Sequence, residues 1–475
     1  MKNSVLACIL CIISVGLFAQ EKPKPITLFT NVQVFDGTSD KLIKADVLVE
    51  GNLIKQISKE PLMVIQTDNV TIIDGGGRTL MPGLIDAHWH TMTNFWPMSK
   101  VLGSNFGELS IAAAIFSRKQ LLRGFTTVRD VGGNVFGVKN AIDAGLVDGP
   151  RIYPSGPFIT QSSGHGDFRG PNDVPENSGT PLDYMQRTGH TLIADGVPEV
   201  TKRTREAFRM GATQIKAMGG GGVGSIYDPL DVTQYTFEEM KAICDVAATW
   251  NTYVAIHVNT DAAIQQWIKA GAKSVEHGFF ITEETAKAMA ENGVWWSMQP
   301  MDADGEDALH FDNPISSAKY DVIVKELDNA IKYAKKYKVK TAFGTDLIFD
   351  AELAAKEGKF LAKMKKWYTP FEALKMATHD NAELIKMCGP RDPYPGELGV
   401  VKEGALADLL LVDGNPLENL DLVADPDKNF LILMKDGKIY KNTLKSVSYT
   451  HLRAHETTAS IAYAVFCLKK GGGGG

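Results

Sequence analysis

Four histidines and one aspartate lie at or near the ends of predicted strands, and side chains of these types bind divalent cations. They are His88, His90, His257, His277 and Asp346. Because His88 and His90 are two residues apart, both side chains would point to the same side of a strand, where one cation could satisfy both imidazoles. A single His-x-His pair is weak evidence, but its combination with the other three residues favours a metal site.

Eight predicted strands would position these side chains. The strands span residues 84–90, 126–132, 151–156, 214–218, 253–259, 274–278, 294–299 and 340–346. Helical patterns separate them, for example at residues 107–124. This alternation predicts an α/β fold with a (β/α)8 TIM-like barrel. The carboxyl ends of barrel strands open on one face, so the candidate ligands would converge there.

Short alternating β patterns flank the predicted barrel at both chain ends. They occur in residues 20–80 and 386–445, and we expect one small β-sandwich domain built from both segments beside a barrel of residues 81–385. A Gly- and Pro-rich stretch at residues 160–197 interrupts the alternation after the third strand. Long loops of this kind inside a compact domain are usually functional.

The two termini differ from the rest of the chain. Residues 1–19 place Lys2 before an apolar run that ends in a small residue. This layout predicts a cleaved signal peptide and a secreted or periplasmic protein, without a membrane span. Cys8 weakly resembles a lipidation site, although almost no apolar stretch precedes it. Residues 446–475 end in five glycines and resemble a non-native tail.

Composition argues against two classes of protein. The formal net charge of −6 gives no basic footprint for nucleic acid. Outside the predicted leader and tail only Cys244 and Cys388 remain, so the chain is not a disulfide scaffold and must rely on a large core. The partner that we expect is a small-molecule substrate.

Lys216, in the fourth predicted strand, fits a metal site less directly. An ammonium group close to bound cations would be repelled and costly to desolvate. One interpretation pairs Lys216 with a carboxylate at the barrel rim. The interpretation that we favour is that CO2 adds to the neutral amine and forms a carbamate, which is an anionic ligand able to bridge two metals.

Several segments resemble the amidohydrolase superfamily. They are MPGLIDAHWH, TTVRDVGG, IKAMGGGGVGS, VAIHV, SVEHG, FGTD and GVVKEGALADLLLVDGNPLENL. The chain is most similar to the Xaa-Pro dipeptidase and imidazolonepropionase-like group, over residues 26–442. The resemblance implies two divalent ions, Zn²⁺ in the first instance, and a homo-oligomeric enzyme.

The resemblance also implies a role for each candidate ligand. The two histidines of the first strand would bind the more buried metal with Asp346, and His257 and His277 would bind the second. Carboxylated Lys216 would bridge the two ions. Hydroxide held between them would attack the carbonyl of an amide, and Asp346 would carry the proton to the leaving nitrogen.

Residues outside the metal site are assigned less directly. His165 in SSGHGD matches a family position that can hydrogen-bond the substrate carbonyl, although a lone loop histidine is as often merely exposed. Asn259 stands where dipeptidases of the group often carry a carboxylate-binding Tyr. Tyr227 and Tyr235 could compensate, and the three are our candidate substrate-binding residues. Arg129 and Asp130 are predicted to form a structural ion pair.

Three functions remain open at this point. The first is hydrolysis of a dipeptide or an N-acyl amino acid by a binuclear enzyme. The second is hydrolysis of a cyclic amide by a mononuclear, imidazolonepropionase-like enzyme, in which Lys216 would have no bridging role. The third is a catalytically inactive homologue that serves as a binding protein, although such proteins usually lose ligands and all six positions are filled here.

Overall fold

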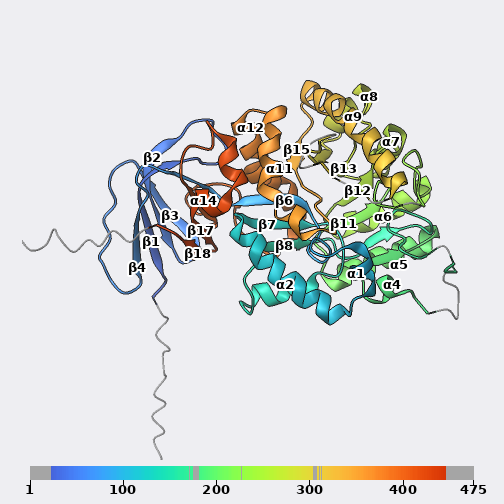
Figure 1. Ribbon diagram of the computed structural model, residues 1–475, viewed down its shortest axis with the longest axis horizontal. Coiled ribbons are helices and arrows are strands. Elements are labelled where there is room, and N and C mark those ends of the chain that lie inside the picture. Colours follow the sequence, from blue (N-terminus) through green and yellow to red (C-terminus); the bar gives the residue numbers. More distant parts are fainter. Residues whose placement is uncertain are drawn as a thin grey trace, which may run out of the picture.

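The computed structural model describes residues 23–170, 172–174, 181–225, 227–302, 308–309, 311 and 313–444. The predicted leader at residues 1–19 and the predicted tail at 446–475 lie outside this part of the chain. Within it, no helix is both long and apolar enough to cross a membrane. Figure 1 shows two regions, with a β-sheet region on the left and an α/β region on the right.

The α/β region contains parallel strands in two sheets. One sheet has the order β6-β7-β8, and the other has the order β10-β9-β11-β12-β13-β14-β15. The strands are β6 (Leu84–Trp89), β7 (Phe125–Asp130), β8 (Arg151–Pro154), β9 (Phe158–Thr160), β10 (Thr191–Ile193), β11 (Ile215–Met218), β12 (Val254–Val258), β13 (Ser274–His277), β14 (Trp295–Met298) and β15 (Thr341–Phe343). Neighbouring strands in both sheets pair in parallel.

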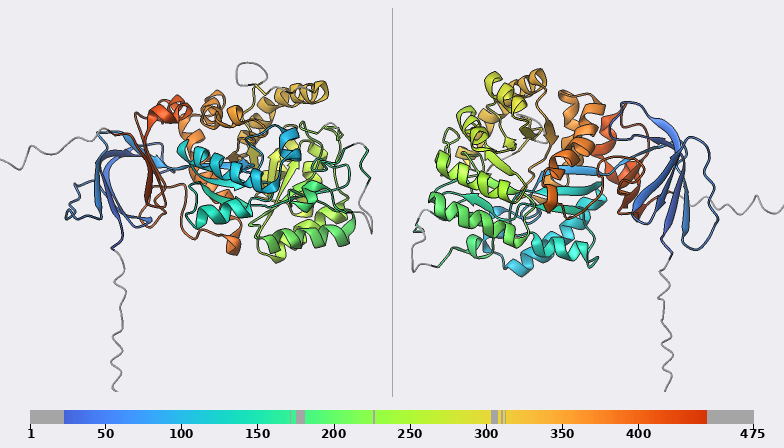
Figure 2. Two further views of the ribbon diagram at one scale, coloured as in Figure 1. Left: turned by 60° about the horizontal axis from the view of Figure 1, so that its bottom comes forward. Right: turned by 180° about the vertical axis from the view of Figure 1, so that it is seen from behind.

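Helices surround the parallel strands, as the views from two further sides show (Figure 2). They are α1 (Met98–Gly103), α2 (Phe106–Leu122), α3 (Phe136–Asp143), α4 (Tyr184–Arg187), α5 (Gly196–Met210), α6 (Phe237–Thr249), α7 (Asp261–Ala270), α8 (Glu283–Glu291), α9 (Pro314–Tyr337), α10 (Ala351–Ala354), α11 (Glu357–Lys363), α12 (Pro370–Lys375) and α13 (Asn381–Lys386). A five-residue π-helix, η2 (Met376–Asp380), joins α12 to α13. The 3-10 turns are η1 (Met364–Lys366), η3 (Gly389–Arg391) and η4 (Leu420–Ala424).

Local sequence signals account for several helix ends. Thr236 and Glu239 form a capping box at the start of α6, which satisfies backbone N–H groups that have no partner inside the helix. Asn313 caps α9, and Pro314 follows at its first position. Gly211 ends α5 with a φ of 112°, a left-handed conformation that glycine adopts without strain.

A separate sheet is built from both ends of the described chain. Its order is β18-β17-β16-β5-β1-β2-β3, and β4 pairs with β1. The strands are β1 (Ile26–Val34), β2 (Ile43–Glu50), β3 (Leu53–Ser58), β4 (Val70–Asp74), β5 (Thr79–Pro82), β16 (Leu409–Val412), β17 (Phe430–Lys435) and β18 (Lys438–Asn442). The two chain ends meet where β5 pairs antiparallel with β16. Buried Val, Leu, Ile and Ala side chains from both ends form one hydrophobic cluster in this sheet.

The eight strands that the sequence predicts all occur, each within three residues of its expected ends. Two short parallel strands, β9 and β10, were not predicted because β9 borders the Gly- and Pro-rich region and β10 lies within it. Backbone pairing leaves the predicted barrel as two parallel sheets. The structure therefore shows an α/β fold with parallel sheets, and both the closed barrel and the separate β-sandwich domain remain predictions.

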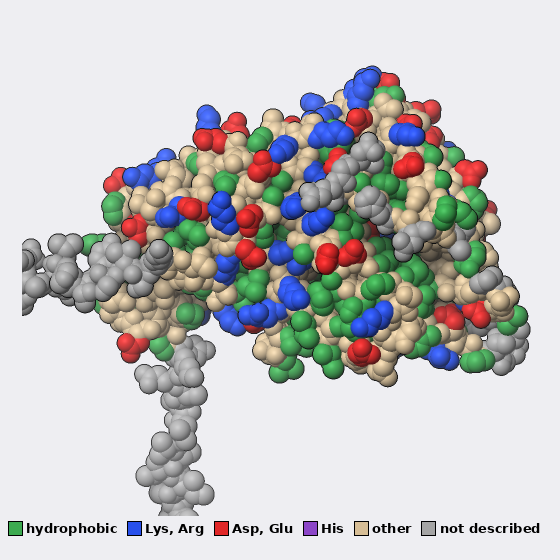
Figure 3. All heavy atoms as spheres, viewed as in Figure 1, with side chains coloured by type: hydrophobic (Ala, Val, Ile, Leu, Met, Phe, Trp, Pro, Cys, Tyr) green, Lys and Arg blue, Asp and Glu red, His purple; other side chains and the backbone are tan. Residues whose placement is uncertain are grey.

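Side chains of both charges are interspersed over the face of the molecule shown in Figure 3. Lys and Arg alternate with Asp and Glu there, with hydrophobic side chains between them.

Candidate metal centre

Three of the predicted ligands form a compact group at the carboxyl ends of β6 and β15. The Nε2 atoms of His88 and His90 lie 3.5 and 3.2 Å from the same carboxylate oxygen of Asp346, Oδ1. These three residues have ligand atoms within 4.8 Å of one another, the spacing of a metal site. Asp346 Oδ1 is buried and has no hydrogen-bond partner in the described structure. A cation would satisfy this oxygen and both imidazoles together.

The other two histidines adjoin this group. The ring of His277 lies 4.9 Å from that of His88 and 4.4 Å from that of His257. His277 Nδ1 donates to Gln299 Oε1 at 2.9 Å, so its Nε2 is the nitrogen left for a ligand role. His257 Nε2 is buried without a partner among the described residues.

Lys216 lies in β11 beside these histidines and is fully buried. It lowers the pKa of His88, of His257 and of His277 through its charge, after the larger effect of burial. None of the described residues accepts a hydrogen bond from its ammonium. The structure thus brings Lys216 together with the predicted ligands.

Electrostatics favour the protonation states that a cation requires. Burial, followed by the charge of Lys216, lowers the pKa of His88 to about 4. Burial alone would raise the pKa of Asp346, but His88, His90 and His277 outweigh it and hold the pKa below its usual value. Burial lowers the pKa of Lys216 to about 8. Near neutral pH the His88 imidazole is therefore neutral, and it lies beside an ionised Asp346 carboxylate.

The backbone holds two of the ligands in strained conformations. His277 has a φ of 72° and Asp346 has a φ of 52°, both in the left-handed region that non-glycine residues rarely adopt. Such strain persists only where the surroundings impose it, and it gathers at functional sites. A direct bond from Asp346 N to the carbonyl oxygen of His88, at 2.9 Å, is one such constraint.

Glu276 orients His88, a role that the sequence did not suggest. Its Oε2 lies 2.8 Å from His88 Nδ1, which leaves Nε2 facing Asp346. Arg129 Nη2 donates to both oxygens of Glu276, at 2.8 and 2.7 Å, and all three side chains are buried. The predicted ion pair between Arg129 and Asp130 is therefore wrong. Neighbouring strand residues point to opposite sides, and Asp130 instead accepts a bond from Thr91 N at 2.7 Å.

His165 lies against one of the candidate ligands, His257. Its ring stacks on that of His257, with centroids 4.0 Å apart and planes inclined by 12°. The backbone passes directly over this stack at Gly222, where an added Cβ would lie 2.2 Å from His165 Cε1 and 2.6 Å from His257 Nε2. Glycine is therefore required at position 222 for the two rings to occupy their places.

The three candidate substrate residues lie in different surroundings. Asn259 is buried, and its Nδ2 donates to the carbonyl oxygen of Gly221 at 2.8 Å. Tyr227 is 51% exposed on the loop after β11. Tyr235 is buried against Trp267, with ring centroids 6.3 Å apart, and its hydroxyl has no partner among the described residues. Of the three, Tyr227 is the side chain that offers an accessible polar group.

Comparison with known proteins decides the family. The model of the amidohydrolase family matches residues 79–440, a span that contains all of the candidate ligands. The chain belongs to the amidohydrolase family. This amidohydrolase is a hydrolase with an α/β fold, and enzymes of its family are typically metal-dependent.

Three relatives show what this amidohydrolase resembles. It is 34% identical to the ochratoxinase of Aspergillus niger over 375 residues, which are 76% of this chain and 75% of that protein. It is also 34% identical to a prolidase solved in complex with N-methylphosphonate-L-proline, with a TM-score of 0.80 over 88% of this chain and 100% of that one. A Xaa-Pro dipeptidase solved with bound methionine is 27% identical, with a TM-score of 0.75 over 88% of this chain and 100% of that one.

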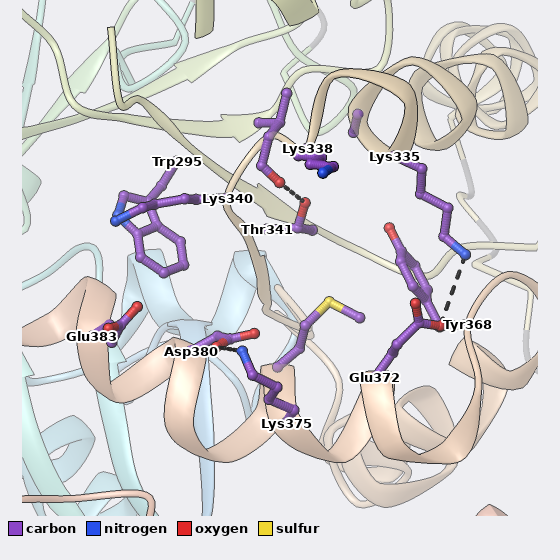
Figure 4. A pocket seen from close by; sticks show the side chains of 13 residues that line it. Trp295, Lys335, Lys338, Lys340, Thr341, Tyr368, Glu372, Lys375, Asp380 and Glu383 are labelled. Atoms are coloured by element: carbon purple, nitrogen blue, oxygen red, sulfur yellow. Dashed lines mark hydrogen bonds and ion pairs between the residues drawn. The ribbon is translucent and has the colours of Figure 1, made fainter. Parts of the chain in front are cut away.

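A cavity of about 450 Å³ lies elsewhere in this amidohydrolase (Figure 4). Its lining includes Trp295 and Thr341, the first residues of β14 and β15. It therefore opens at the amino ends of these strands, whereas Asp346 follows the carboxyl end of β15. Charged side chains in its wall pair with each other, as Lys375 does with Asp380. We place the chemistry at the carboxyl ends, where the buried unpaired ligand atoms lie.

A second group of residues has the spacing of metal ligands, and it adjoins this cavity. It comprises His379, Asp380 and Glu383. The carboxylate of Asp380 already pairs with Lys375 and lies 2.8 Å from His379 Nδ1. These contacts satisfy the group without a cation.

Proposed function

We propose that this protein is a binuclear metal-dependent amidohydrolase that cleaves the amide bond of a small substrate, either a dipeptide or an N-acyl amino acid. The ligands of one ion would be His88, His90 and Asp346, and those of the other His257 and His277. Lys216, as a carbamate formed with CO2, would bridge them. Similarity to a prolidase, a Xaa-Pro dipeptidase and ochratoxinase supports an amide substrate.

The observation that carries the proposal is the convergence of unpaired buried ligand atoms at one place. Asp346 Oδ1 faces two imidazole nitrogens at 3.2 and 3.5 Å, and His257 Nε2 is buried close by without a partner. Burying unpaired polar atoms is costly unless a ligand satisfies them. Lys216 supports two ions over one, because a buried amine between histidines has no role in a single-metal site.

Each group of residues would have a distinct role in the reaction. Two divalent cations bound here would supply Lewis acidity, which activates water and polarises the scissile carbonyl. Asp346 would accept the proton that the attacking water releases and deliver it to the leaving nitrogen, since an amine departs only when protonated. His165 would donate a hydrogen bond to the carbonyl oxygen as negative charge develops there. Tyr227 would contact the substrate from the loop, together with Asn259 and Tyr235 beneath it.

Further parts of the proposal concern the whole chain. We propose that the two parallel sheets close into one (β/α)8 barrel and that the sheet built from both chain ends is a separate β-sandwich domain. We also propose export, with cleavage near Ala19, as the composition of residues 1–19 suggests. The protein would act as a homo-oligomer with Zn²⁺ or a similar divalent ion as its cofactor.

A substrate screen tests the proposed reaction. Zinc-loaded protein would be incubated with dipeptides, N-acyl amino acids and cyclic amides, and the products identified by mass spectrometry. We expect release of a free amino acid from the first two classes. Lys216→Ala should lower kcat by about 10²-fold or more, and short carboxylic acids should restore part of the activity by replacing the carbamate. Lys340→Ala, at the opposite strand ends, is the control.

Two results would overturn the proposal. Activity confined to cyclic amides and unaffected by Lys216→Ala would indicate a mononuclear cyclic-amide hydrolase. Tight binding of these compounds without turnover, at full metal content, would indicate an inactive binding protein.

A further inference from the structure

The loop after β11 is tied to helix α9 by one lysine. Lys319 Nζ donates to the carbonyl oxygens of Gly222, Ser225 and Asp228, at 2.9, 2.7 and 2.6 Å. These bonds use all three hydrogens of the ammonium group. Lys319 therefore has no donor left for a substrate carboxylate, and its contacts fix the position of the loop.

Asp228, in the same loop, is buried and holds His165. Its Oδ2 lies 2.9 Å from His165 Nδ1 and accepts a bond from Gly222 N at 2.9 Å. Gln234 supports the same arrangement, because its Oε1 accepts a bond from His165 N at 3.0 Å. Three contacts thus define both the backbone and the ring of His165.

These contacts determine which nitrogen of His165 is available. A carboxylate can only accept, so the proton of the neutral ring resides on Nδ1, which donates to Asp228. Stacking on His257 fixes the plane of the ring. The nitrogen that remains for a substrate is Nε2. Donation from Nε2 to an oxyanion requires a hydrogen on both ring nitrogens, and the Asp228 carboxylate accepts the bond from Nδ1–H in that form as well.

We propose that Lys319 and Asp228 are positioning residues that hold His165 with Nε2 directed at the reacting carbonyl. Lys319 fixes the loop, the loop fixes Asp228, and Asp228 fixes the tautomer and tilt of His165. The inference rests on the proposed function for the reaction that His165 assists. The hydrogen-bonded arrangement itself does not depend on the substrate.

The variants Asp228→Asn, Lys319→Met and Lys319→Arg test the proposal. Asp228→Asn removes the charge but keeps the shape, and we expect it to lower kcat about 10²-fold with KM changed less than about 3-fold. Lys319→Met should lower kcat by a smaller factor, about 10-fold, because Gln234 still supports the loop. Lys319→Arg retains donors for the carbonyl oxygens and should restore most of kcat. Lys325→Met, an exposed lysine on the same helix, is the control.

A readout other than activity separates this inference from the proposed function. In protein with ¹⁵N-labelled histidine, His165 Nδ1–H should give a downfield proton resonance that is lost in His165→Asn and in Asp228→Asn. Metal content should be unchanged in Asp228→Asn and Lys319→Met. If the resonance persists in Asp228→Asn, or if kcat stays within about 3-fold of wild type, the positioning role is wrong. If the resonance behaves as expected but no substrate is hydrolysed, the proposed function fails and the arrangement stands.

Discussion

Glu276 is not one of the proposed metal ligands, but it holds one of them, His88, in place. It lies between the buried Arg129 guanidinium and His88 Nδ1. Burial would raise the pKa of Glu276, but Arg129 and His88 outweigh burial and hold the pKa well below its usual value. Glu276 is therefore an ionised partner for both residues.

Glu276→Gln should disturb both stability and metal binding. It leaves the charge of Arg129 buried without a counter-ion, which we expect to cost about 3–5 kcal/mol in the free energy of unfolding. The substitution also weakens the hydrogen bond that orients His88, so metal affinity should fall about 10–100-fold. Denaturant unfolding and metal titration measure the two effects. The control is Ser274→Ala, which removes one bond to the same carboxylate. We expect it to lower the free energy of unfolding by only about 1 kcal/mol. A Glu276→Gln variant as stable as Ser274→Ala would contradict the argument.

The requirement for glycine at position 222 can be tested by comparison with Gly224, two residues away. Gly222→Ala would place a Cβ 2.2 Å from His165 Cε1, whereas a Cβ at Gly224 meets nothing within 4 Å. We expect Gly222→Ala to displace the stacked rings and lower kcat about 10²-fold, because catalysis is sensitive to small misplacement. Gly224→Ala should retain wild-type kinetics. Equal kinetics for the two variants would show that the close approach at position 222 is unimportant.

The residue types of the candidate metal centre were predictable, and the residues that support them were not. His88, His90 and Asp346 stand at strand ends, so the period of the strand and the common direction of parallel strands were enough to predict that they lie together. The partners of Glu276 and Asp228 come from distant segments, such as Lys319 on α9. One signal was present for Glu276: a buried acidic residue within a strand requires a cation or a donor nearby.

At the scale of elements, Asn381 joins β6 to β15 where the two parallel sheets meet. Its Nδ2 donates to the carbonyl oxygens of Ile85 and Phe343, at 2.6 and 2.8 Å, and its Oδ1 accepts from Phe343 N at 3.0 Å. These strands carry His88 and precede Asp346. Asn381 at the start of α13 thus holds together the two elements from which the first three ligands come.

Asn381→Ala would leave three buried backbone groups without partners. We expect it to lower the free energy of unfolding by about 2–4 kcal/mol, measured by urea denaturation, and to weaken metal binding at the His88 side. Asn329→Ala, which removes an exposed side-chain contact on α9, should cost under about 0.5 kcal/mol. A small effect of Asn381→Ala would mean that the strands hold together without this link.

His190, between α4 and β10, should make stability depend on pH. Burial lowers its pKa to about 4, so the fold favours the neutral ring and the unfolded chain binds more protons between pH 4 and 6.5. Its contribution is complete above about pH 6.5 and is lost as pH falls toward 4, by about 3 kcal/mol at most. His190→Phe keeps an aromatic ring against Phe106 and should flatten this slope. His379→Phe, the control, should leave the pH dependence of stability unchanged. Parallel slopes of stability against pH for wild type and His190→Phe would show that His190 is not the group responsible.

The strands themselves were predictable from sequence because each is a short apolar run bounded by turn residues. Strands β9 and β10 were missed because they lie at the edge of the Gly- and Pro-rich region or within it, where three residues give no periodic pattern that stands out from the loop. The pairing of strands from opposite chain ends was expected in outline. Its register, with Leu410 opposite Met81, depends on packing that no local pattern reveals.

At the scale of the whole molecule, a partly buried ion-pair network joins the outer sheet to the parallel strands. Arg151, at the start of β8, pairs with Asp408 and, at 2.7 Å, with Asp436. Lys435 in β17 donates to the carbonyl oxygen of Gly149 at 2.8 Å. The sheet built from the chain ends is therefore attached at the amino end of β8, away from the candidate ligands. The candidate metal centre lies at the opposite, carboxyl ends of the strands.

The central claim is that the six candidate ligands hold two cations side by side. The most direct measurement is anomalous X-ray scattering from crystals of zinc-loaded protein. We predict two peaks per chain, one beside His88, His90 and Asp346 and one beside His257 and His277, with continuous density from Lys216 Nζ between them. A single peak, or peaks away from these residues at saturating zinc, would contradict the account.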